Sequence, residues 1–274
     1  MANHLYKIEC LTNLHVGSGD VNYNIIDNEV EKDAVTGYPI IHSSGIKGAL
    51  REHASKNQFK GNESAEVAIF GQKSGKGDVA PGTYKFFDAN IISRPMRVIN
   101  GEIASIPVIA IDAINDFLHK ITALGCNIYD IEKIDTPDFK GNRFLSNVSG
   151  INVEGESTGD VPQKIAQQLA KLKDIIGEKY AIAARINDYD LPVVARNQLD
   201  NGESKNLWYE EVVPHGSVFY TLIITPEKDT LAEKDTLGLS DIIQIGGHAT
   251  IGYGFTRFTE LKKDGVIDEQ KKSK

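Results

Sequence analysis

The sequence predicts an α+β fold in which helices pack on one face of an antiparallel sheet. Three observations predict it. Residues 4–16 alternate between apolar and polar side chains, as a half-buried strand does. Residues 107–124 and 161–176 repeat their apolar side chains at the spacing of an amphipathic helix. Residues 207–213 and 217–224 are two strand-like runs around a Pro-His-Gly turn, so strands dominate the C-terminal part.

Turn and capping residues divide the N-terminal part into elements. Glycine and serine mark a turn after the first strand, and a proline favours an extended path before the first helix. Ser43 and Ser44 are good N-cap residue types for that helix. The elements predicted here are, in chain order, a turn at 17–20, a long polar loop over 20–37, an extended run at 38–41 and a helix over 45–57.

The middle of the chain mixes helical periodicity with irregular stretches. Pro107 opens the best helix and Gly125 closes it. The predicted elements are a loop over 58–82 with one apolar anchor at 67–70, a strand over 83–94, the helix over 107–124, an irregular stretch over 126–160 and the helix over 161–176.

The C-terminal part ends in a glycine-rich turn that leads into a last strand. Residues 237–245 predict a short helix or strand, and residues 245–258 read IGGHATIGYGFTRF. We find no linker that divides the chain and no long internal repeat. The sequence therefore predicts a single domain over 1–274.

Composition indicates an ordinary globular protein. The chain has 274 residues, of which 41% are hydrophobic and 25% are charged. It contains no apolar run long enough for a membrane span and no secretory signal, so we expect no membrane partner and a cytoplasmic location. Cys10 and Cys126 lie far apart without a CxxC pattern, which predicts two small core residues rather than a disulfide framework or a zinc site.

The net charge of −8 argues against a stand-alone, non-specific nucleic-acid binder, because phosphate neutralisation supplies most of such an affinity. It leaves room for a local basic groove on an otherwise acidic body. One arrangement with this property is a subunit whose basic strip is shared with its neighbours.

An acidic loop follows the first strand. Its four carboxylates, Asp27, Glu29, Glu31 and Asp33, lie two residues apart, so in an extended segment they point the same way. Such a row could attract a divalent cation, or it could be a solvated loop edge. Asp27 differs from the others because two isoleucines precede it and could anchor the loop.

Residues 43–51 could bind phosphate at the start of a helix. The first helical turn offers unpaired N–H groups, and Lys47 and Arg51 are four residues apart on one face. Gly45 and Gly48 allow a nucleic-acid backbone to approach closely. The alternative is a surface helix with two solvated cations.

Two further segments could contact an anion. Gly246 and Gly247 begin a turn whose amides could cradle phosphate, or whose glycines could serve backbone geometry alone. His15, next to Gly17 and Ser18, could contact phosphate or transfer a proton, or be a satisfied histidine at a strand end. No histidine pair has zinc-ligand spacing, and residues 71–77 depart from the Walker pattern.

Taken together, these segments resemble the RAMP superfamily of CRISPR proteins, and within it the repeated backbone subunits of Cmr-type (type III-B) effector complexes. The matching pieces occur in the family's order: 15–19, Ile26-Asp27 with 39–51, GTYKFFDANIISRPMR at 82–97, Leu-Trp-x-Glu-Glu at 207–211, and the glycine-rich strand at 245–257.

The resemblance implies a ferredoxin-like, RRM-related core with long loops and an inserted thumb, which we place at about 126–205. It also implies copies stacked in a filament on a CRISPR guide RNA, with other type III effector subunits. In the family, a loop aspartate supports cutting of single-stranded target RNA at regular intervals. By motif alignment that residue is Asp27, acting as a general base or as the holder of a divalent metal, Mg²⁺.

The RNA-binding residues implied here are His15, Gly17, Ser18, Ser43, Ser44, Lys47, Arg51, Gly246 and Gly247. Glu210 and Glu211 are secondary candidates. The Ile-Asp-Asn start of the acidic loop resembles Csm-type (type III-A) subunits instead. Two other readings stay open, a guide-binding subunit without cleavage and a guide-processing nuclease that acts alone.

Overall fold

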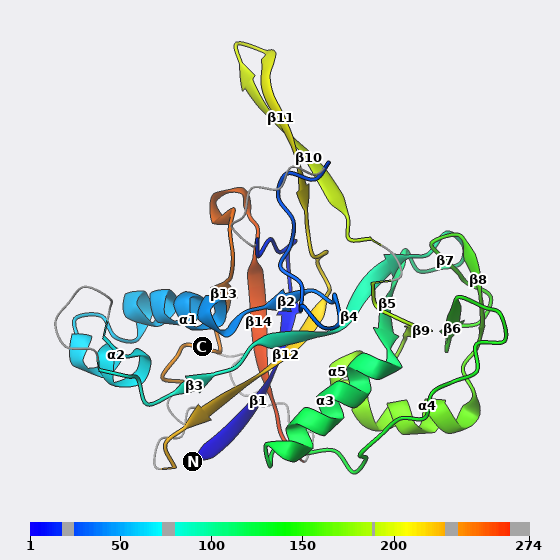
Figure 1. Cartoon of the computed structure of the whole chain (residues 1–274), viewed down its shortest axis with the longest axis horizontal. Coiled ribbons are helices and arrows are strands. Elements are labelled where there is room, and N and C mark those ends of the chain that lie inside the picture. Colours follow the sequence, from blue (N-terminus) through cyan, green and yellow to red (C-terminus); the bar gives the residue numbers. More distant parts are fainter. Residues whose placement is uncertain (18–24, 73–79, 188–189, 228–234, 264–274) are drawn as a thin grey trace.

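The computed structural model describes residues 1–17, 25–72, 80–187, 190–227 and 235–263. Its main feature is one large mixed sheet, with strand order β13-β14-β1-β12-β4-β5-β9-β6-β8-β7 in this part of the chain. Two short strands, β2 and β3, pair with β4 and β12 beside that path. The strands β10 and β11 form a separate hairpin that stands out from the body (Figure 1).

The strands of the sheet and hairpin are β1 (Ala2–Cys10), β2 (Ile40–Ile41), β3 (Lys85–Phe86), β4 (Ala89–Arg97), β5 (Ser105–Ala110), β6 (Phe144–Ser146), β7 (Asn152–Val153), β8 (Glu156–Asp160), β9 (Ala181–Ala183), β10 (Val193–Asp200), β11 (Glu203–Glu211), β12 (Val218–Thr225), β13 (Ile242–Gln244) and β14 (Phe255–Leu261). The helices are α1 (Ser43–Asn57), α2 (Glu63–Phe70), α3 (Ile111–Ala123), α4 (Gln163–Leu169) and α5 (Lys173–Ile176), with short 3₁₀ turns η1 (Ala170–Leu172) and η2 (Ala249–Ile251).

Strand β1 lies between β12 and β14 and pairs with both of them antiparallel. Its side chains alternate between two cores. Ile8 belongs to the cluster that contains Leu50 of α1, whereas Leu5 belongs to the cluster that contains Phe117 of α3. The period-two pattern that predicted this strand comes from the face toward α1, since on the other face Leu5 is buried but Lys7 and Glu9 are only half-buried.

Helices cover both faces of the sheet, so the prediction of helices on one face was wrong. Helices α1 and α2 pack on one side, and α3, α4 and α5 pack on the other (Figure 1). Both faces of β12 are apolar, because Phe219 packs in the first core and Tyr220 in the second. The expected mixture of strands and helices is confirmed, while the ferredoxin-like arrangement of the core stays a prediction.

Two elements differ from the sequence-based expectation. Residues 105–110 form β5, so Pro107 lies in a strand opposite Pro95 and does not open the helix. Residues 106–110 are buried except for the half-buried Pro107, and a short apolar run of this kind fits a buried strand as well as a helix. The predicted loop at 58–82 contains α2, which begins after Asn62, whose side chain accepts a hydrogen bond from the N–H of Ala65.

The region 126–205 contains regular elements that extend the large sheet. Strand β9 pairs parallel with β5 and antiparallel with β6, and β6 pairs parallel with β8. A third apolar cluster, with Phe144 and Ile106, holds these strands together. Cys10 is buried in the first core and Cys126 is half-buried, both as free thiols, as the sequence predicted. No helix in the described ranges is long and apolar enough to cross a membrane.

Candidate nucleic-acid interface

Asp27 lies at the root of the β10–β11 hairpin, along the edge of β11 that β10 leaves open. Its backbone N–H donates to the carbonyl oxygen of Tyr209 at 3.1 Å, and its Oδ2 accepts from the N–H of Tyr209 at 2.8 Å. The residue is exposed. Of the two isoleucines considered as an anchor, Ile25 is 91% exposed and Ile26 is half-buried. Backbone pairing with β11 fixes Asp27.

The four carboxylates of the acidic loop do not converge. Asp33 Oδ1 accepts from the N–H groups of Val35 and Thr36 and thereby closes a local turn. Glu31 Oε1 lies 3.1 Å from His42 Nε2, at the start of α1. Within the described ranges, no three His, Cys, Asp or Glu side chains are placed to hold a metal ion. A site built from protein ligands alone therefore does not fit this loop.

Glu211 ties the loop to the hairpin. It is only 3% exposed, its Oε2 accepts from the N–H of Val30 at 3.0 Å, and its Oε1 lies 3.0 Å from Lys32 Nζ. Its backbone carbonyl accepts a hydrogen bond from Nδ1 of His15 at 2.8 Å. The loop segment that follows Asp27 is thus held from two sides.

Glu210 points to the other face of the hairpin and is 1% exposed. Trp208 Nε1 and Arg196 Nε donate to its two oxygens at 2.7 and 3.1 Å, and His248 Nε2 lies 3.3 Å away. Burial tends to raise the pKa of Glu210, but these hydrogen bonds and the charges of His248 and Arg196 outweigh it and hold the pKa below its ordinary value. Glu210 is therefore a buried, paired anion.

The glycine-rich turn packs directly on His15, which is 7% exposed. The N–H of Gly247 donates to the carbonyl oxygen of His15 at 2.9 Å. Gly246 has φ +79°, and a Cβ there would lie 2.4 Å from that same oxygen. A Cβ on Gly17 would lie 2.8 Å from the His15 ring. These glycines serve close packing and backbone geometry, and the amide of Gly247 is already used. Ser18 lies outside the described residues.

The start of α1 differs from the predicted capping. His42 is the N-cap residue, so Ser43 and Ser44 lie inside the first turn. The N–H of Ser43 donates to Oδ1 of Asp88 at 2.6 Å, so a carboxylate already occupies part of this helix end. Ser44 and Gly48 are exposed, and a Cβ on Gly48 would meet nothing within 4 Å.

The two cations of α1 have different surroundings. Arg51 donates from Nε to Glu66 at 2.7 Å, lies over the Phe70 ring, and its side chain is 17% exposed. It therefore joins α1 to α2. Lys47 is half-buried, and in the described part of the chain its side chain makes no ion pair or hydrogen bond. Of the two, Lys47 is better placed to meet a phosphate.

The predicted residues thus fall into two groups. Asp27, His15, Gly17, Gly246 and Gly247 meet at the hairpin root, and the Glu31–His42 contact links this group to Ser43, Ser44 and Lys47 on α1. Sequence reasoning missed Arg196, Tyr209, His248 and Tyr253 as neighbours of the site. The Leu-Trp-Tyr-Glu-Glu run was a signal for this place, but the pairing of β11 with the acidic loop joins residues some 180 positions apart.

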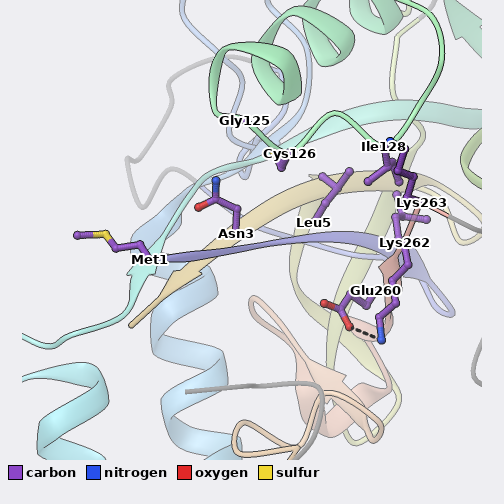
Figure 2. A pocket seen from close by; sticks show the side chains of 10 residues that line it. Met1, Asn3, Leu5, Gly125, Cys126, Ile128, Glu260, Lys262 and Lys263 are labelled. Atoms are coloured by element: carbon purple, nitrogen blue, oxygen red, sulfur yellow. Dashed lines mark ion pairs between the residues drawn. The ribbon is translucent and has the colours of Figure 1, made fainter. Parts of the chain in front are cut away.

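A separate cavity of about 370 Å³ lies at the end of the molecule opposite the hairpin, near the N-terminus (Figures 1 and 2). Leu5, Cys126 and Lys263 are among its lining residues, and Figure 2 shows the ion pair between Glu260 and Lys262 at its wall. None of the predicted site residues lines it. The hairpin root is therefore the place where the candidate residues meet.

Comparison with known proteins gives a consistent result. The model of the RAMP superfamily matches residues 7–257 of the chain. The chain is 26% identical over 297 residues to the CRISPR system Cmr endoribonuclease Cmr4 of Pyrococcus furiosus, which covers 94% of this chain and 96% of that relative.

Solved structures share the fold. A chain of the type III-B Cmr-beta complex bound to cognate target RNA superposes with a TM-score of 0.73 at 18% identity, covering 94% of this chain and 96% of that one. Oligomeric Cmr4 from Pyrococcus furiosus gives a TM-score of 0.66 at 20% identity, covering 96% and 99% of the two chains.

Proposed function

Because the chain belongs to the RAMP superfamily, we propose that it is a guide-RNA-binding backbone subunit of a type III CRISPR effector complex and that it cleaves target RNA at regular intervals. The Pyrococcus relative is named an endoribonuclease, which supports cleavage of RNA. The observation that carries the proposal is the exposed Asp27 carboxylate, fixed by Tyr209 at the root of a protruding hairpin.

The partners in this proposal are a CRISPR guide RNA, a single-stranded target RNA, further copies of the chain in a filament, and other type III effector subunits. The cytoplasm is the proposed location. The similarity to a chain of a Cmr-beta complex bound to cognate target RNA and to oligomeric Cmr4 supports these partners. The proposal favours the Cmr subtype over the Csm subtype because the curated relative is a Cmr protein.

Asp27 is the proposed catalytic residue. The ribose 2′-OH of a splayed target nucleotide attacks the adjacent phosphate, the bond to the 5′-oxygen breaks, and the carboxylate accepts the hydroxyl proton. The 5′-oxygen leaves with a proton from water, which gives a 2′,3′-cyclic phosphate and a 5′-hydroxyl end. Pairing with β11 keeps the carboxylate in one place, and positioning of this kind supplies a large part of such rate enhancements.

A divalent metal, Mg²⁺, is the cofactor that the family resemblance implies. The described residues offer the Asp27 carboxylate but no group of three or more protein ligands, so in the reaction above Asp27 itself accepts the proton. Mg²⁺ commonly takes one or two carboxylates together with substrate phosphates and water. Titration of the assembled complex with EDTA, followed by addition of Mg²⁺, tests the metal dependence of cleavage.

Guide binding is proposed for the exposed side of α1 and the residues around His15. Ser44, Gly48 and Lys47 give α1 a polar, closely approachable surface with one cation. The helix dipole adds to it, although Asp88 offsets part of that attraction. His15 is buried and supports the turn at Gly246 and Gly247, so it acts by shaping this surface.

The hairpin β10–β11 is the proposed thumb. Its strands cover 193–211, which overlaps the region 126–205 expected for the thumb and continues to the Leu-Trp-Tyr-Glu-Glu run. The chain is proposed to act as a single RAMP domain over 1–274.

The test is cleavage by a complex assembled from the full-length chain, a guide and labelled target RNA. Asp27→Asn should abolish cutting while target binding persists, because an amide oxygen still accepts from Tyr209 but no longer takes a proton. Asp33→Asn in the same loop is the matched control, since its amide oxygen can still close the local turn. Asp33→Asn should cleave normally.

Three other results would each contradict the proposal. Persistent cutting by Asp27→Asn at every position would show that Asp27 is not catalytic. Wild-type complexes that bind target without cutting would indicate a binding-only subunit. Cleavage of guide precursors by the isolated chain would indicate a processing nuclease.

A further inference from the structure

The two faces of the hairpin have different neighbours. In the β10–β11 pair, Arg196 stands opposite Trp208 and Ala195 stands opposite Tyr209. Side chains of directly opposite residues share a face, so Arg196, Trp208 and Glu210 point to one side. The backbone of Tyr209, between Trp208 and Glu210, is the partner of the Asp27 carboxylate. Contacts that hold the side chains of Arg196, Trp208 and Glu210 therefore also fix the edge of β11 to which Asp27 is hydrogen-bonded.

Arg196 is held by an aromatic ring and a buried carboxylate. Its guanidinium carbon lies 4.7 Å from the centre of the Tyr253 ring, and its Nε donates to Glu210 Oε2 at 3.1 Å. Its Nη2 is buried and has no hydrogen-bond partner within the described ranges. The Arg196 side chain is therefore held by two contacts, the ring of Tyr253 and the carboxylate of Glu210.

Tyr253 belongs to the body of the molecule and not to the hairpin. Its N–H donates to the carbonyl oxygen of His248 at 3.2 Å, and its ring meets the His248 ring edge-on at 6.1 Å. The next residue, Gly254, donates to the carbonyl oxygen of Asn13 at 2.8 Å, and β14 follows directly. The contact between Arg196 and Tyr253 thus joins the hairpin to the central sheet.

We propose that Arg196 and Tyr253 are positioning residues for target cleavage. Their stacked pair fixes the angle between the hairpin and the sheet, and through the backbone of Tyr209 it sets the place of the Asp27 carboxylate. Neither residue touches Asp27. The inference rests on the proposed function, because it assigns these residues a role in the cleavage step carried by Asp27.

Arg196 contacts the aromatic ring of Tyr253, so the ring and not the hydroxyl group is the part required for positioning. A planar guanidinium stacks on an aromatic face, whereas a lysine ammonium carries the charge without the plane. Phenylalanine keeps the stacking face and removes only the hydroxyl. Leucine removes the face. A small rotation of the hairpin would move Asp27 by enough to slow the reaction, since misplacement by about 1 Å can reduce a rate about a hundredfold.

The experiment measures single-turnover cleavage by the assembled complex over a range of complex concentrations. For Tyr253→Leu, we expect the rate constant at saturation to fall about tenfold or more, with the half-saturating concentration within about twofold of wild type. Tyr253→Phe should match wild type. Tyr129→Leu, which truncates a half-buried tyrosine in the other core, is the matched control and should leave the rate constant unchanged.

Arg196→Lys is the second variant, and it carries the same expectation if Tyr253→Leu fails to assemble. It keeps a cation beside Glu210 and loses the stacked plane. Wild-type rate constants for Tyr253→Leu and Arg196→Lys would overturn the inference. So would an equal loss in Tyr253→Phe and Tyr253→Leu, or a change in target affinity alone. Cleavage that persists in Asp27→Asn would instead overturn the proposed function, so the two failures are distinguishable.

Discussion

Two adjacent glutamates at the hairpin root are buried and use different partners. Glu210 pairs with Arg196, Trp208 and His248, whereas Glu211 holds Val30 and Lys32. A buried carboxylate is costly unless it is hydrogen-bonded and paired, so both are fixed points of the fold. In the sequence, Glu210 and Glu211 could have been strand-surface acids. In the structure both are buried, and their contacts support the hairpin root.

Removal of Glu211 should destabilise the chain far more than removal of its cationic partner. Glu211→Ala leaves the N–H of Val30 and the ammonium of Lys32 without their acceptor, and we expect the free energy of unfolding to fall by about 3 kcal/mol. Lys32→Met should cost about 1 kcal/mol, because the buried Glu211 carboxylate loses its cation but keeps the N–H of Val30, and the Lys32 side of the pair is 40% exposed. Urea denaturation measures both. Equal losses in the two variants would contradict this account of Glu211.

At this level Asp27 was singled out as the catalytic candidate, but for a reason that composition could not supply. The family resemblance selected it, whereas Ile25, one of the two isoleucines considered as an anchor for the loop, is 91% exposed. Arg51 looked like a phosphate ligand until its pairing with Glu66 was visible. Side-chain pairing across 15 or more positions leaves no signature in a local pattern.

Helix α1 combines an approachable surface with one cation that has no partner in the described part of the chain. Gly48 lies in the helix interior, where glycine is unfavourable, and a Cβ there would meet nothing within 4 Å. Glycine at this position lowers the stability of the helix relative to alanine. A closely approaching RNA backbone would account for a glycine there.

Gly48→Ala should therefore stabilise the chain and weaken guide binding. The free energy of unfolding should rise by about 0.5–1 kcal/mol, because alanine loses less conformational entropy in a helix. Guide affinity should fall, because a methyl group would stand where the RNA backbone approaches. Thermal unfolding and filter binding measure the two effects. If both stability and guide affinity rise, α1 does not face the guide.

Lys47→Ala and Arg51→Ala should separate guide binding from stability. Lys47→Ala should weaken guide loading and reduce the slope of log affinity against log salt by about one, with stability unchanged. Arg51→Ala should mainly lower the free energy of unfolding, because it breaks the contacts with Glu66 and Phe70. Guide titrations at several salt concentrations test this. An unchanged slope in Lys47→Ala would remove Lys47 from the interface.

Elements with a clear local pattern of apolar side chains were predictable, and elements whose burial depends on distant partners were not. The alternation of β1 and the apolar stripe of α3 were visible in the sequence. Residues 107–110 were assigned to that helix, although they pair with β4 and β9 as a strand. The parallel pairing that decides this uses residues from beyond position 180.

The described part of the molecule is organised around a sheet buried on both faces, and the β10–β11 hairpin projects from it (Figure 1). The second helical layer had a signal in the sequence that the prediction of one helical face did not use, because strands buried on both faces read as continuous apolar runs and residues 217–224 are such a run. The net charge of −8 stays compatible with RNA binding, since the proposed interface uses only one end of α1 and the hairpin root.

Paired carboxylates should make the fold sensitive to acid. Besides Glu210, Glu260 has a pKa below its ordinary value; burial tends to raise it, but hydrogen bonds from His4 and Lys262 outweigh that effect. A carboxylate with a lowered pKa contributes stability above its unfolded pKa of about 4.3 and loses it as pH falls through the folded value. The urea midpoint should therefore be nearly level from about pH 7 to 5 and drop below about pH 4.

Glu260→Gln serves as the comparison for this pH dependence. The stability difference between wild type and Glu260→Gln should be largest near neutral pH and shrink as the wild-type carboxylate takes up its proton. A difference that stays constant from neutral pH to about pH 3 would show that the charge of Glu260 does not stabilise the fold.

The most direct test of the central claim is the structure of the effector complex assembled from this chain with guide and target RNA. We predict that each Asp27 carboxylate lies within about 3 Å of a ribose 2′-OH on the target strand, at a nucleotide splayed beside the root of the β10–β11 hairpin. Asp27 side chains that lie on the outer surface of the assembly, remote from the target backbone, would contradict it.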